Sequence, residues 1–403
     1  MTQTIIHIDG SFCEGGGQLL RNAVTLSALL TKPVSISNVR QNRQPPGLRR
    51  QHEAGLYILR FEVESTPLKL HVGINLAASI CSAETKGVEV RSTTVDFRPG
   101  PIQLPQALSA DPGTAGSTTL LLQTALPCLL FSPPNTAESV LTLSGGTNAA
   151  LAPQIDYTQA VLLPFLRHFQ RSPTLAVTRR GYYPKGGGTV VCTVPAVAGP
   201  LPPVVLTQRG QLGAVRGSAR VGGLPLSIAQ RMVSSAHRVL VRSGIAATQI
   251  ALTAAREHDA DVVGAGGGIV LWAETDGGCV IGGSAVSTRE KKPEAVGEEA
   301  AEMLVRNLDH GGCVDEYLQD QMIIFLALAK GTSIVKTGPL TDHTRYVGTF
   351  RFASMILTEG NRTAIHVAQR MTGAQFHVDE NMPGAVTITC EGIGFGASSL
   401  DGL

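Results

Sequence analysis

The chain has 403 residues and lacks the features of secreted and membrane proteins. Its seven cysteines include no Cys-x-x-Cys pair and are odd in number, which argues against a disulfide framework and against a zinc site. No stretch reaches the roughly 18 consecutive apolar residues that a membrane helix needs. The first residues, MTQTIIHIDGS, show no basic start followed by a long apolar run, so we expect no secretory signal. We therefore expect a nuclear or cytosolic protein that does not associate with membranes.

An excess of charge of one sign is also missing. The 33 Lys and Arg residues nearly balance the 31 Asp and Glu residues, and a net charge of +2 predicts no partner by itself. Binding of nucleic acid would have to come from a local basic patch. With 43% hydrophobic and 16% charged residues, the composition is typical of a soluble globular protein, and the length suits two or three domains.

Repeated strand–turn–helix patterns predict the fold class. A short apolar strand at 5–8 is followed by glycines at 15–17 and by a helix pattern at 18–30 with its apolar residues on one stripe. The pattern returns with a strand at 140–143, a glycine turn at 144–148 and a further helix. Such units predict an α/β (α+β) architecture built from similar modules.

The sequence changes in character after Gly188. Short strands and many glycines over 188–286 predict a small inserted α/β domain. Residues 1–187 and 287–403 would then form one large, discontinuous domain. Clear helix patterns return at 298–308 and at 314–330.

Two stretches suit the binding of phosphate. The turn EGGGQ opens a helix whose first amides favour anions, and Glu14 would repel phosphate there unless a divalent cation lay between them. A tight structural turn is the alternative. The loop at 40–52 carries Arg40, Arg43, Arg49 and Arg50 without an acidic residue, which suits phosphate oxygens, although a solvated basic loop is the alternative. Because no aromatic residue is interleaved, the loop favours backbone phosphates over bases.

Two further candidate sites lie closer to the C-terminus. Tyr317, Asp320 and Gln321 share one helix face and could hydrogen-bond a purine and a ribose, with a polar solvent-facing surface as the alternative. His343 lies in a polar loop before a helix, where a neutral imidazole could attack phosphorus and hold the phosphoryl group beside the first amides. A surface His without a role is the alternative. His366 lies inside the helix pattern, so we expect it to pack or to lie behind the residues that touch the substrate.

Six segments together carry a family resemblance. In chain order they are EGGGQ, RQNRQPPGLRRQH, SGGTNAALAPQIDY, RGYYPKGGG, DHGGCVDEYLQDQ and TDHTR…TAIHVAQRM. The chain resembles the RNA 3′-terminal phosphate cyclase family, in its eukaryotic form, over nearly its whole length. The resemblance implies a ligase that forms a phosphoric ester bond, using ATP and Mg²⁺ or Mn²⁺ to convert an RNA 3′-phosphate to a 2′,3′-cyclic phosphate through a covalent His–AMP. It also implies a large domain of repeated α/β units similar to the C-terminal domain of bacterial translation initiation factor three.

The resemblance also implies roles for individual residues. His343 matches the nucleophile, and Glu14 matches a position near the metal. The remaining matches are nucleotide-pocket and phosphate-binding positions, namely Gln123, Pro153, Tyr317, Asp320 and Gln321 for ATP, and Arg21, Arg40 and Arg43 for triphosphate or RNA phosphates. RNA 3′-phosphate ends are the expected partner, and no obligate protein partner is predicted. We expect the nucleus (nucleoplasm) as the location, with the cytoplasm second.

Two rival functions belong to other classes. The first is a non-catalytic, cyclase-like factor of ribosome biogenesis, but such relatives lack the nucleophilic His and the EGGGQ signature, and this chain has both. The second is an RNA-end ligase or kinase with another nucleophile, for which no convincing lysine motif is present.

Seventeen residues, 346–362, interrupt the family pattern. The family pattern His-Thr-x-Thr-Ala-Ile-His is unbroken, whereas here Arg345 and Thr363 are separated. We interpret 346–362 as a translated intron, because codons for residues 345–347 can contain GTATGT and codons for residues 361–362 can end the intron in AG. Its removal takes out 51 nucleotides, three for each residue, and keeps the reading frame. A genuine insertion is the alternative, and it would displace the helix that supports His343 and impair activity.

Overall fold

The structure, a computed structural model, has the mixed helices and strands that the sequence predicts. It describes residues 4–12, 16–41, 46–48, 70–89, 91–132, 136–341, 363–382 and 384–396. Glu14, Arg43, His343 and the segment 346–362 lie outside the described residues, and what we expect of them stays a prediction. The α/β class itself is confirmed.

Three repeats with one strand order build most of the molecule. In each repeat the first two strands are parallel, the other pairs are antiparallel, and the spatial order of the four strands is first, second, fourth, third. The strands of the first repeat are β1 (Ile6–Asp9), β2 (Val34–Ser37), β3 (Glu84–Lys86) and β4 (Val95–Arg98). Those of the second are β5 (Ala107–Ala110), β6 (Ser139–Gly145), β7 (Thr174–Gly181) and β8 (Gly188–Val194). Those of the third are β9 (Val205–Leu206), β15 (Lys330–Thr337), β16 (Gln375–Met382) and β17 (Ala385–Ile393).

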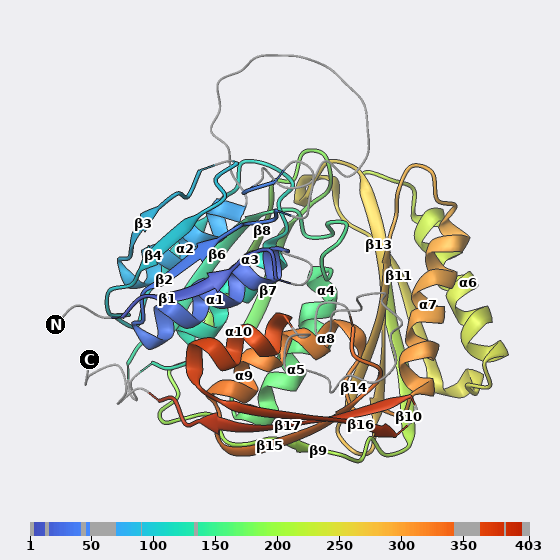
Figure 1. Cartoon of the computed structure of the whole chain (residues 1–403). Helices are drawn as coiled ribbons and strands as arrows, with labels where there is room; N and C mark the ends of the chain where they lie inside the picture. Colours follow the sequence, from blue (N-terminus) through green and yellow to red (C-terminus); the bar gives the residue numbers. More distant parts are fainter. Residues whose placement is uncertain are drawn as a thin grey trace.

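Helices connect the parallel strands, because a parallel pair needs a crossover connection. The first repeat has α1 (Gly17–Leu30) and α2 (Leu70–Cys81). The second has α3 (Thr118–Leu129) and a run made of α4 (Ile155–Tyr157), a π-helical turn (Thr158–Leu162) and α5 (Leu163–Leu166). The third has α8 (Glu316–Gln321), α9 (Ile323–Leu328) and α10 (Thr363–Thr372). Helices of different repeats pack together, α1 against α3 and α10, and α9 against α10, so the helices meet in the middle and the sheets lie outside them (Figure 1).

A separate sheet lies to the right in Figure 1. Its strands, in the order β11-β10-β13-β14, are β10 (Leu212–Gly222), β11 (Ile250–Arg256), β13 (Gly266–Thr275) and β14 (Val280–Val286). Helices α6 (Leu226–Arg242) and α7 (Pro293–Asp309) pack against each other and against this sheet. We call residues 212–309 the inserted unit. The short β12 (Val262–Val263) from this stretch pairs with β7 of the second repeat.

The predicted division at 188–286 differs from the grouping of the strands. Strand β8 begins at Gly188 but pairs with β6 and β7, so it belongs to the sheet of the second repeat. Helix α7 follows the predicted end of the insert but packs on β14 and α6. The strand pairing therefore favours 212–309 as the inserted unit, while the division of the chain into domains stays a prediction.

The helix predicted at 314–330 is confirmed over most of its length, but it is divided into two helices. The structure has two short helices that meet at Met322, and the chain is extended from Lys330, where β15 begins. Residues 330–337 read KGTSIVKT, and β-branched residues favour strands, particularly where two neighbouring strands are available. Here β9 and β17 pair with β15 on its two sides, which explains why the helical stretch ends before Lys330.

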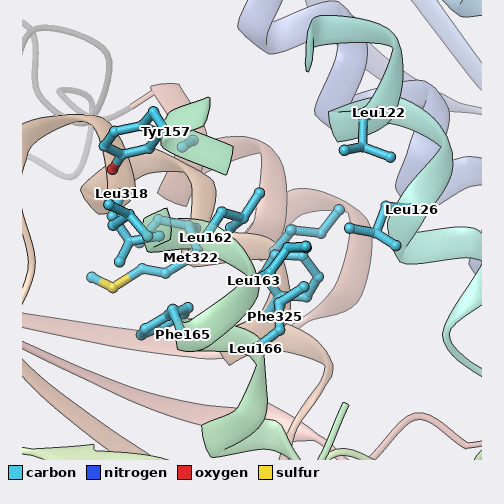
Figure 2. Close-up of a cluster of buried hydrophobic side chains, with 14 of the residues drawn as sticks. Leu122, Leu126, Tyr157, Leu162, Leu163, Phe165, Leu166, Leu318, Met322 and Phe325 are labelled. Atoms are coloured by element: carbon cyan, nitrogen blue, oxygen red, sulfur yellow. The ribbon is translucent and has the colours of Figure 1, made fainter. Parts of the chain in front are cut away.

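A buried core fixes the helices that carry the candidate site. Figure 2 shows Leu122 and Leu126 of α3, residues of the α4–α5 run such as Leu162 and Phe165, and Met322 and Phe325 of the third repeat packed together. All of these side chains are buried. Each buried side chain of this size contributes roughly 1.5–3 kcal/mol to stability. The core therefore joins α3, the α4–α5 run and the start of α9 through one cluster of apolar side chains.

Candidate active site

The predicted site residues lie in or just after the connections that leave the carboxyl ends of parallel strands. In parallel pairs these ends meet at one edge of a sheet, which is where ligands bind in open α/β sheets. The connection after β1 contains Glu14, the one after β2 contains Arg40 and Arg43, the one after β6 contains Pro153, and the one after β15 contains His343. The repeated topology thus brings equivalent connections from all three repeats to the same side of their sheets.

A small cavity lies between α1, α3, the π-helical turn and α8–α9. Three glutamine side chains from three different helices line it, Gln18, Gln123 and Gln321. Its apolar walls include Leu126, Leu162 and Phe325. The cavity volume of about 20 Å³ has room for one water. The structure therefore brings Gln123 and Gln321, predicted from distant segments, into one cavity.

Arg21 lies one turn beyond Gln18 on α1. Its Nη2 donates to the Gln18 carbonyl oxygen Oε1 at 2.6 Å, and its Nε is buried without a hydrogen-bond partner among the described residues. Burial lowers the pKa of Arg21 to about 10, and attraction to Asp320 on α8 opposes that shift. The side chain is still a cation at neutral pH. A buried cation with an unsatisfied donor fits an anionic ligand such as a triphosphate.

Asp315 holds the start of α8. Its Oδ1 accepts hydrogen bonds from the Tyr157 hydroxyl at 2.6 Å and from the amides of Tyr317 and Leu318, both at 3.0 Å. Its Oδ2 accepts from the Gly282 amide at 2.7 Å. Burial raises the pKa of Asp315 to about 6, although the hydrogen bonds that it accepts oppose the shift. This carboxylate ties α8 to α4 and to β14.

Pro153 joins the α8 residues through α4 rather than through the cavity. Its buried carbonyl oxygen accepts a hydrogen bond from the Thr119 hydroxyl in the first turn of α3 at 2.8 Å. Two residues beyond Pro153, α4 begins, and the Tyr157 ring at its end meets the Tyr317 ring edge-on, with centroids 5.6 Å apart. Gln154 also donates to the carbonyls of Ile269 and Ala285, both at 3.1 Å, which anchors this loop to the inserted unit.

Gln319 fixes the segment that leads towards His343. Its amide nitrogen donates to the Thr337 hydroxyl at 2.8 Å and to the Pro339 carbonyl at 3.1 Å. Its Oε1 accepts from the backbone amide of Thr341, two residues before His343, at 2.7 Å. Helix α8 therefore carries both the Tyr317, Asp320 and Gln321 face and the anchor of the β15–α10 connection.

The rival histidine packs as predicted. The His366 ring, in the first turns of α10, stacks on Phe12 with centroids 4.2 Å apart. Burial lowers the pKa of His366, so the ring is neutral at physiological pH. The stack joins α10 to the connection between β1 and α1.

Arg40 does not line the cavity, and the predicted metal site lies outside the described residues. Arg40 follows β2 in the left-handed region, with φ of 55°, and its side chain is buried outside the residues that line the cavity. Within the described part of the chain, no three His, Cys, Asp or Glu side chains are grouped so that they could hold a metal ion. Because Glu14 lies outside that part, the metal stays a prediction.

Sequence reasoning missed Gln18, Asp315 and Gln319 as contributors. Asp315 directly precedes the helix EYLQDQ, and an Asp at that position is an N-cap signal. Gln18 closes the EGGGQ segment, but the residue that it faces depends on how α1 packs. No local signal identifies Gln319, because its partners come from β15 and the loop after it.

Comparisons with known proteins identify the family. The family model described as RNA 3′-terminal phosphate cyclase matches residues 12–62 and 69–348. A protein of Dictyostelium discoideum named probable RNA 3′-terminal phosphate cyclase is 36% identical over 98% of this chain and 84% of its own length. The RNA 3′-terminal phosphate cyclase of Drosophila melanogaster is 37% identical over 97% of this chain and 98% of its own. The Archaeoglobus fulgidus protein of the same name is 40% identical over 90% of this chain and 100% of its own.

The family match covers the first two repeats almost completely, and it ends at residue 348, just inside the segment 346–362. Of the helices in the described ranges, none combines the length and apolar character needed to cross a bilayer. The family model and the relatives both cover most of this chain. The chain belongs to the RNA 3′-terminal phosphate cyclase family.

Proposed function

We propose that this protein uses ATP to convert the 3′-phosphate end of an RNA into a 2′,3′-cyclic phosphate. The observation that supports it most directly is the convergence of Gln18, Gln123 and Gln321 from three separate repeats around one cavity, with the buried Arg21 hydrogen-bonded to Gln18. The names of the family and of the relatives point to the same activity. The non-catalytic alternative gains no support from those names.

The proposed chemistry has three steps. The imidazole of His343 attacks the α-phosphorus of ATP, a nitrogen–phosphorus bond forms, and pyrophosphate leaves. An oxygen of the RNA 3′-phosphate then takes the AMP group, and His343 is released. Finally the neighbouring 2′-hydroxyl attacks the activated 3′-phosphorus, closes the ring and expels AMP. The last step is intramolecular, so it needs mainly orientation.

The described residues suit the nucleotide in separate ways. Arg21 offers a buried cation with an unsatisfied Nε donor to the triphosphate. The amides of Gln123 and Gln321 and the ring of Tyr317 suit the base and the ribose. With a cavity of about 20 Å³, ATP needs side chains to move as it enters.

We propose that a divalent cation, Mg²⁺ or Mn²⁺, binds next to Glu14, which is the one residue proposed to lie near the metal. A carboxylate next to a triphosphate is stabilised when a cation bridges the two. The cation would neutralise charge on the phosphate oxygens.

We also propose a nuclear location, which a fluorescently tagged full-length chain tests in cells.

The segment 346–362 is proposed to be a translated intron. The corresponding connection of the second repeat, from β6 to α4, spans residues 146–154. The connection from β15 to α10 spans residues 338–362, and removal of 346–362 would leave 338–345, a similar length. Helix α10 begins at Thr363, directly after the segment. Sequencing of cDNA across the site tests this, and transcripts that all retain the 51 nucleotides would refute it.

The activity is tested with ATP that carries a label on its α-phosphate. The full chain, the chain without 346–362 and the His343→Ala variant of each are incubated with Mg²⁺ or Mn²⁺ and then denatured. Retained label that disappears with His343→Ala supports the covalent intermediate. Label in the shortened chain alone supports both the enzyme and the translated intron. Folded proteins that never retain label would favour the non-catalytic scaffold.

A further inference from the structure

The hairpin between β7 and β8 lies at the same edge as the candidate site. Gly145, the last residue of β6, pairs with Gly188, the first residue of β8, so the hairpin leaves the sheet beside the connection that carries Pro153. The backbone amide of Thr147 in that connection donates to the Gly181 carbonyl at 3.0 Å. The hairpin, residues 182–187, reads YYPKGG. None of its residues has a role in the function proposed above.

The base of the hairpin is firmly held. Tyr182 is buried, and its ring lies against the backbones of Gly222 and Gly266 in the inserted unit, where a larger residue would clash. The Gly186 amide donates to the Tyr182 carbonyl at 2.9 Å. Gly186 itself has φ of 65° and approaches the Thr114 backbone so closely that a side chain would not fit. The hairpin is therefore clamped between the inserted unit and the loop before α3.

Arg180 holds the end of β7 below the hairpin. Its buried guanidinium pairs with Asp156 of α4 through two bonds of 2.6 and 2.7 Å and with Glu257 at 2.9 Å. Because Asp156 lies three residues after Pro153, the same ion pair fixes the hairpin relative to the loop that approaches Tyr317. The chain thus holds the hairpin at a defined position next to the proposed nucleotide site.

The tip of this fixed hairpin is exposed and carries an aromatic side chain next to a positively charged one. Tyr183 is 59% exposed and is the one aromatic residue among the large apolar side chains that the described part exposes. Lys185 in the hairpin and Arg179 near the end of β7 are both exposed. Within the described ranges, neither side chain forms an ion pair with an acidic residue. On the neighbouring connection, Leu151 is 86% exposed and adopts a left-handed φ of 59°, which is uncommon for a residue other than glycine. An exposed ring on a rigid backbone offers a surface for stacking at little entropic cost.

We propose that this hairpin binds the single-stranded 3′ end of the RNA, with Tyr183 stacked on a base and Lys185 bound to a backbone phosphate. The inference rests on the proposed function and adds a surface for the RNA beside the nucleotide site. Every base has a π face, so stacking on Tyr183 recognises single strands without selecting a sequence. Lys185 supplies charge that the nearly neutral chain as a whole does not.

The proposal is tested with a 3′-phosphorylated oligonucleotide that carries 2-aminopurine at each of its last four positions in turn. The variants are Tyr183→Ala, Tyr183→Phe and Lys185→Ala, with Val241→Ala on α6 as an exposed apolar control. They are made in the full chain and, in parallel, in the chain without 346–362. Three quantities are measured: RNA-independent labelling by ATP, the dissociation constant for the oligonucleotide, and the quenching of 2-aminopurine fluorescence.

Tyr183→Ala is expected to weaken RNA binding about 10-fold, to abolish the quenching at one position and to leave labelling by ATP within twofold of the unchanged protein. Tyr183→Phe and Val241→Ala should behave like the unchanged protein. Lys185→Ala should weaken binding and reduce the salt dependence by about one unit of slope. RNA binding and quenching that survive Tyr183→Ala would overturn the proposal. Labelling that falls together with RNA binding would overturn it too, because the hairpin would then act on the nucleotide site.

The failure of the proposed function gives a different result. If the unchanged protein neither takes up label nor closes the RNA end, the activity is refuted. The quenching still reports whether Tyr183 stacks on RNA in that case.

Discussion

The centre of the molecule and the inserted unit differ in where their charged and hydrogen-bonding side chains lie. In the inserted unit, charged residues pair on the surface, as in Arg231–Glu294 at 2.6 Å, Arg216–Glu274 at 3.1 Å and Lys291–Glu299 at 2.6 Å. Between the helices of the three repeats, polar groups such as Asp315 and Gln319 are buried. Burial of a polar group costs free energy unless its partners are placed well, whereas an exposed ion pair contributes little to stability.

This contrast indicates which polar groups are needed. The buried groups fix α8 and the connections that leave the parallel strands, where the candidate site lies. The exposed ion pairs lie on the surface of helices and strands whose packing depends on apolar contacts. A substitution in the centre should therefore affect stability or activity, and one in the surface pairs should not.

The largest effect is expected for Asp315→Ala. The substitution removes the acceptor of the Tyr157 hydroxyl and of the Gly282 amide, and it also removes the N-cap of α8. Buried donors left without partners cost roughly 1–3 kcal/mol each, so we expect a loss of about 3 kcal/mol in the free energy of unfolding, measured by urea denaturation. Glu294→Ala serves as the control, with no measurable change. A loss below about 1 kcal/mol for Asp315→Ala, by the same scale, would contradict the contrast.

A large loss of activity is expected for Arg21→Met. This change keeps the length of the side chain in the core and removes the buried charge beside Gln18 and Asp320. Labelling by ATP should fall about 100-fold, as expected when a charged hydrogen bond to a phosphate worth roughly 3 kcal/mol is lost. Arg238→Met on α6, whose partner Glu298 is 3.9 Å away, is the matched surface control. Equal labelling by the two variants would remove Arg21 from the nucleotide site.

A smaller effect of pH separates Asp315→Asn from the unchanged protein. The pKa of Asp315 is raised to about 6 in the folded protein, above the value of 3.8 for an ordinary Asp, so the folded state holds its proton more strongly than the unfolded state. The stabilisation from this group is complete below pH 4 and is lost as pH rises through 6. Between pH 5 and pH 7 the unchanged protein should lose about 1 kcal/mol more than Asp315→Asn does. Parallel stability curves for the two proteins would show that this carboxyl does not titrate in the window.

The smallest effect is expected for Arg231→Ala. The guanidinium and Glu294 are both exposed, and solvent screens their attraction. Thermal denaturation should give the same Tm within error, and labelling by ATP should not change. A clear fall in Tm would mean that the exposed pairs contribute to stability after all.

Local patterns predicted the elements near the first glycine turn well. The strand and helix expected at 5–8 and 18–30 are found at Ile6–Asp9 and Gly17–Leu30. The hydrophobic periodicity of these two elements involves residues that are close in sequence, so it can be recognised from the sequence alone. The helical stretch expected over 314–330 is found as two helices, and the break at Met322 was not predicted.

The candidate site was predictable only in part. Family resemblance, and no local pattern, related Gln123 to Gln321, which lie on different repeats and meet at one cavity. The positions of Asp315 and Gln319 depend on which elements pack over α8. Which elements pack over α8 is known from the tertiary structure, and local patterns in a single sequence do not predict it.

The position of the inserted unit has a consequence for how the protein folds. In the first two repeats, residues that pair across the parallel strands are close in sequence, as Ile6 is to Val34 and Ala107 to Val140. In the third repeat Val205 pairs with Ile334, with the whole inserted unit between them. Contacts between distant residues close slowly, because more chain entropy is lost first. The third repeat therefore closes only after the inserted unit has been synthesised, and since α8 belongs to it, the candidate site is assembled later than the first two repeats.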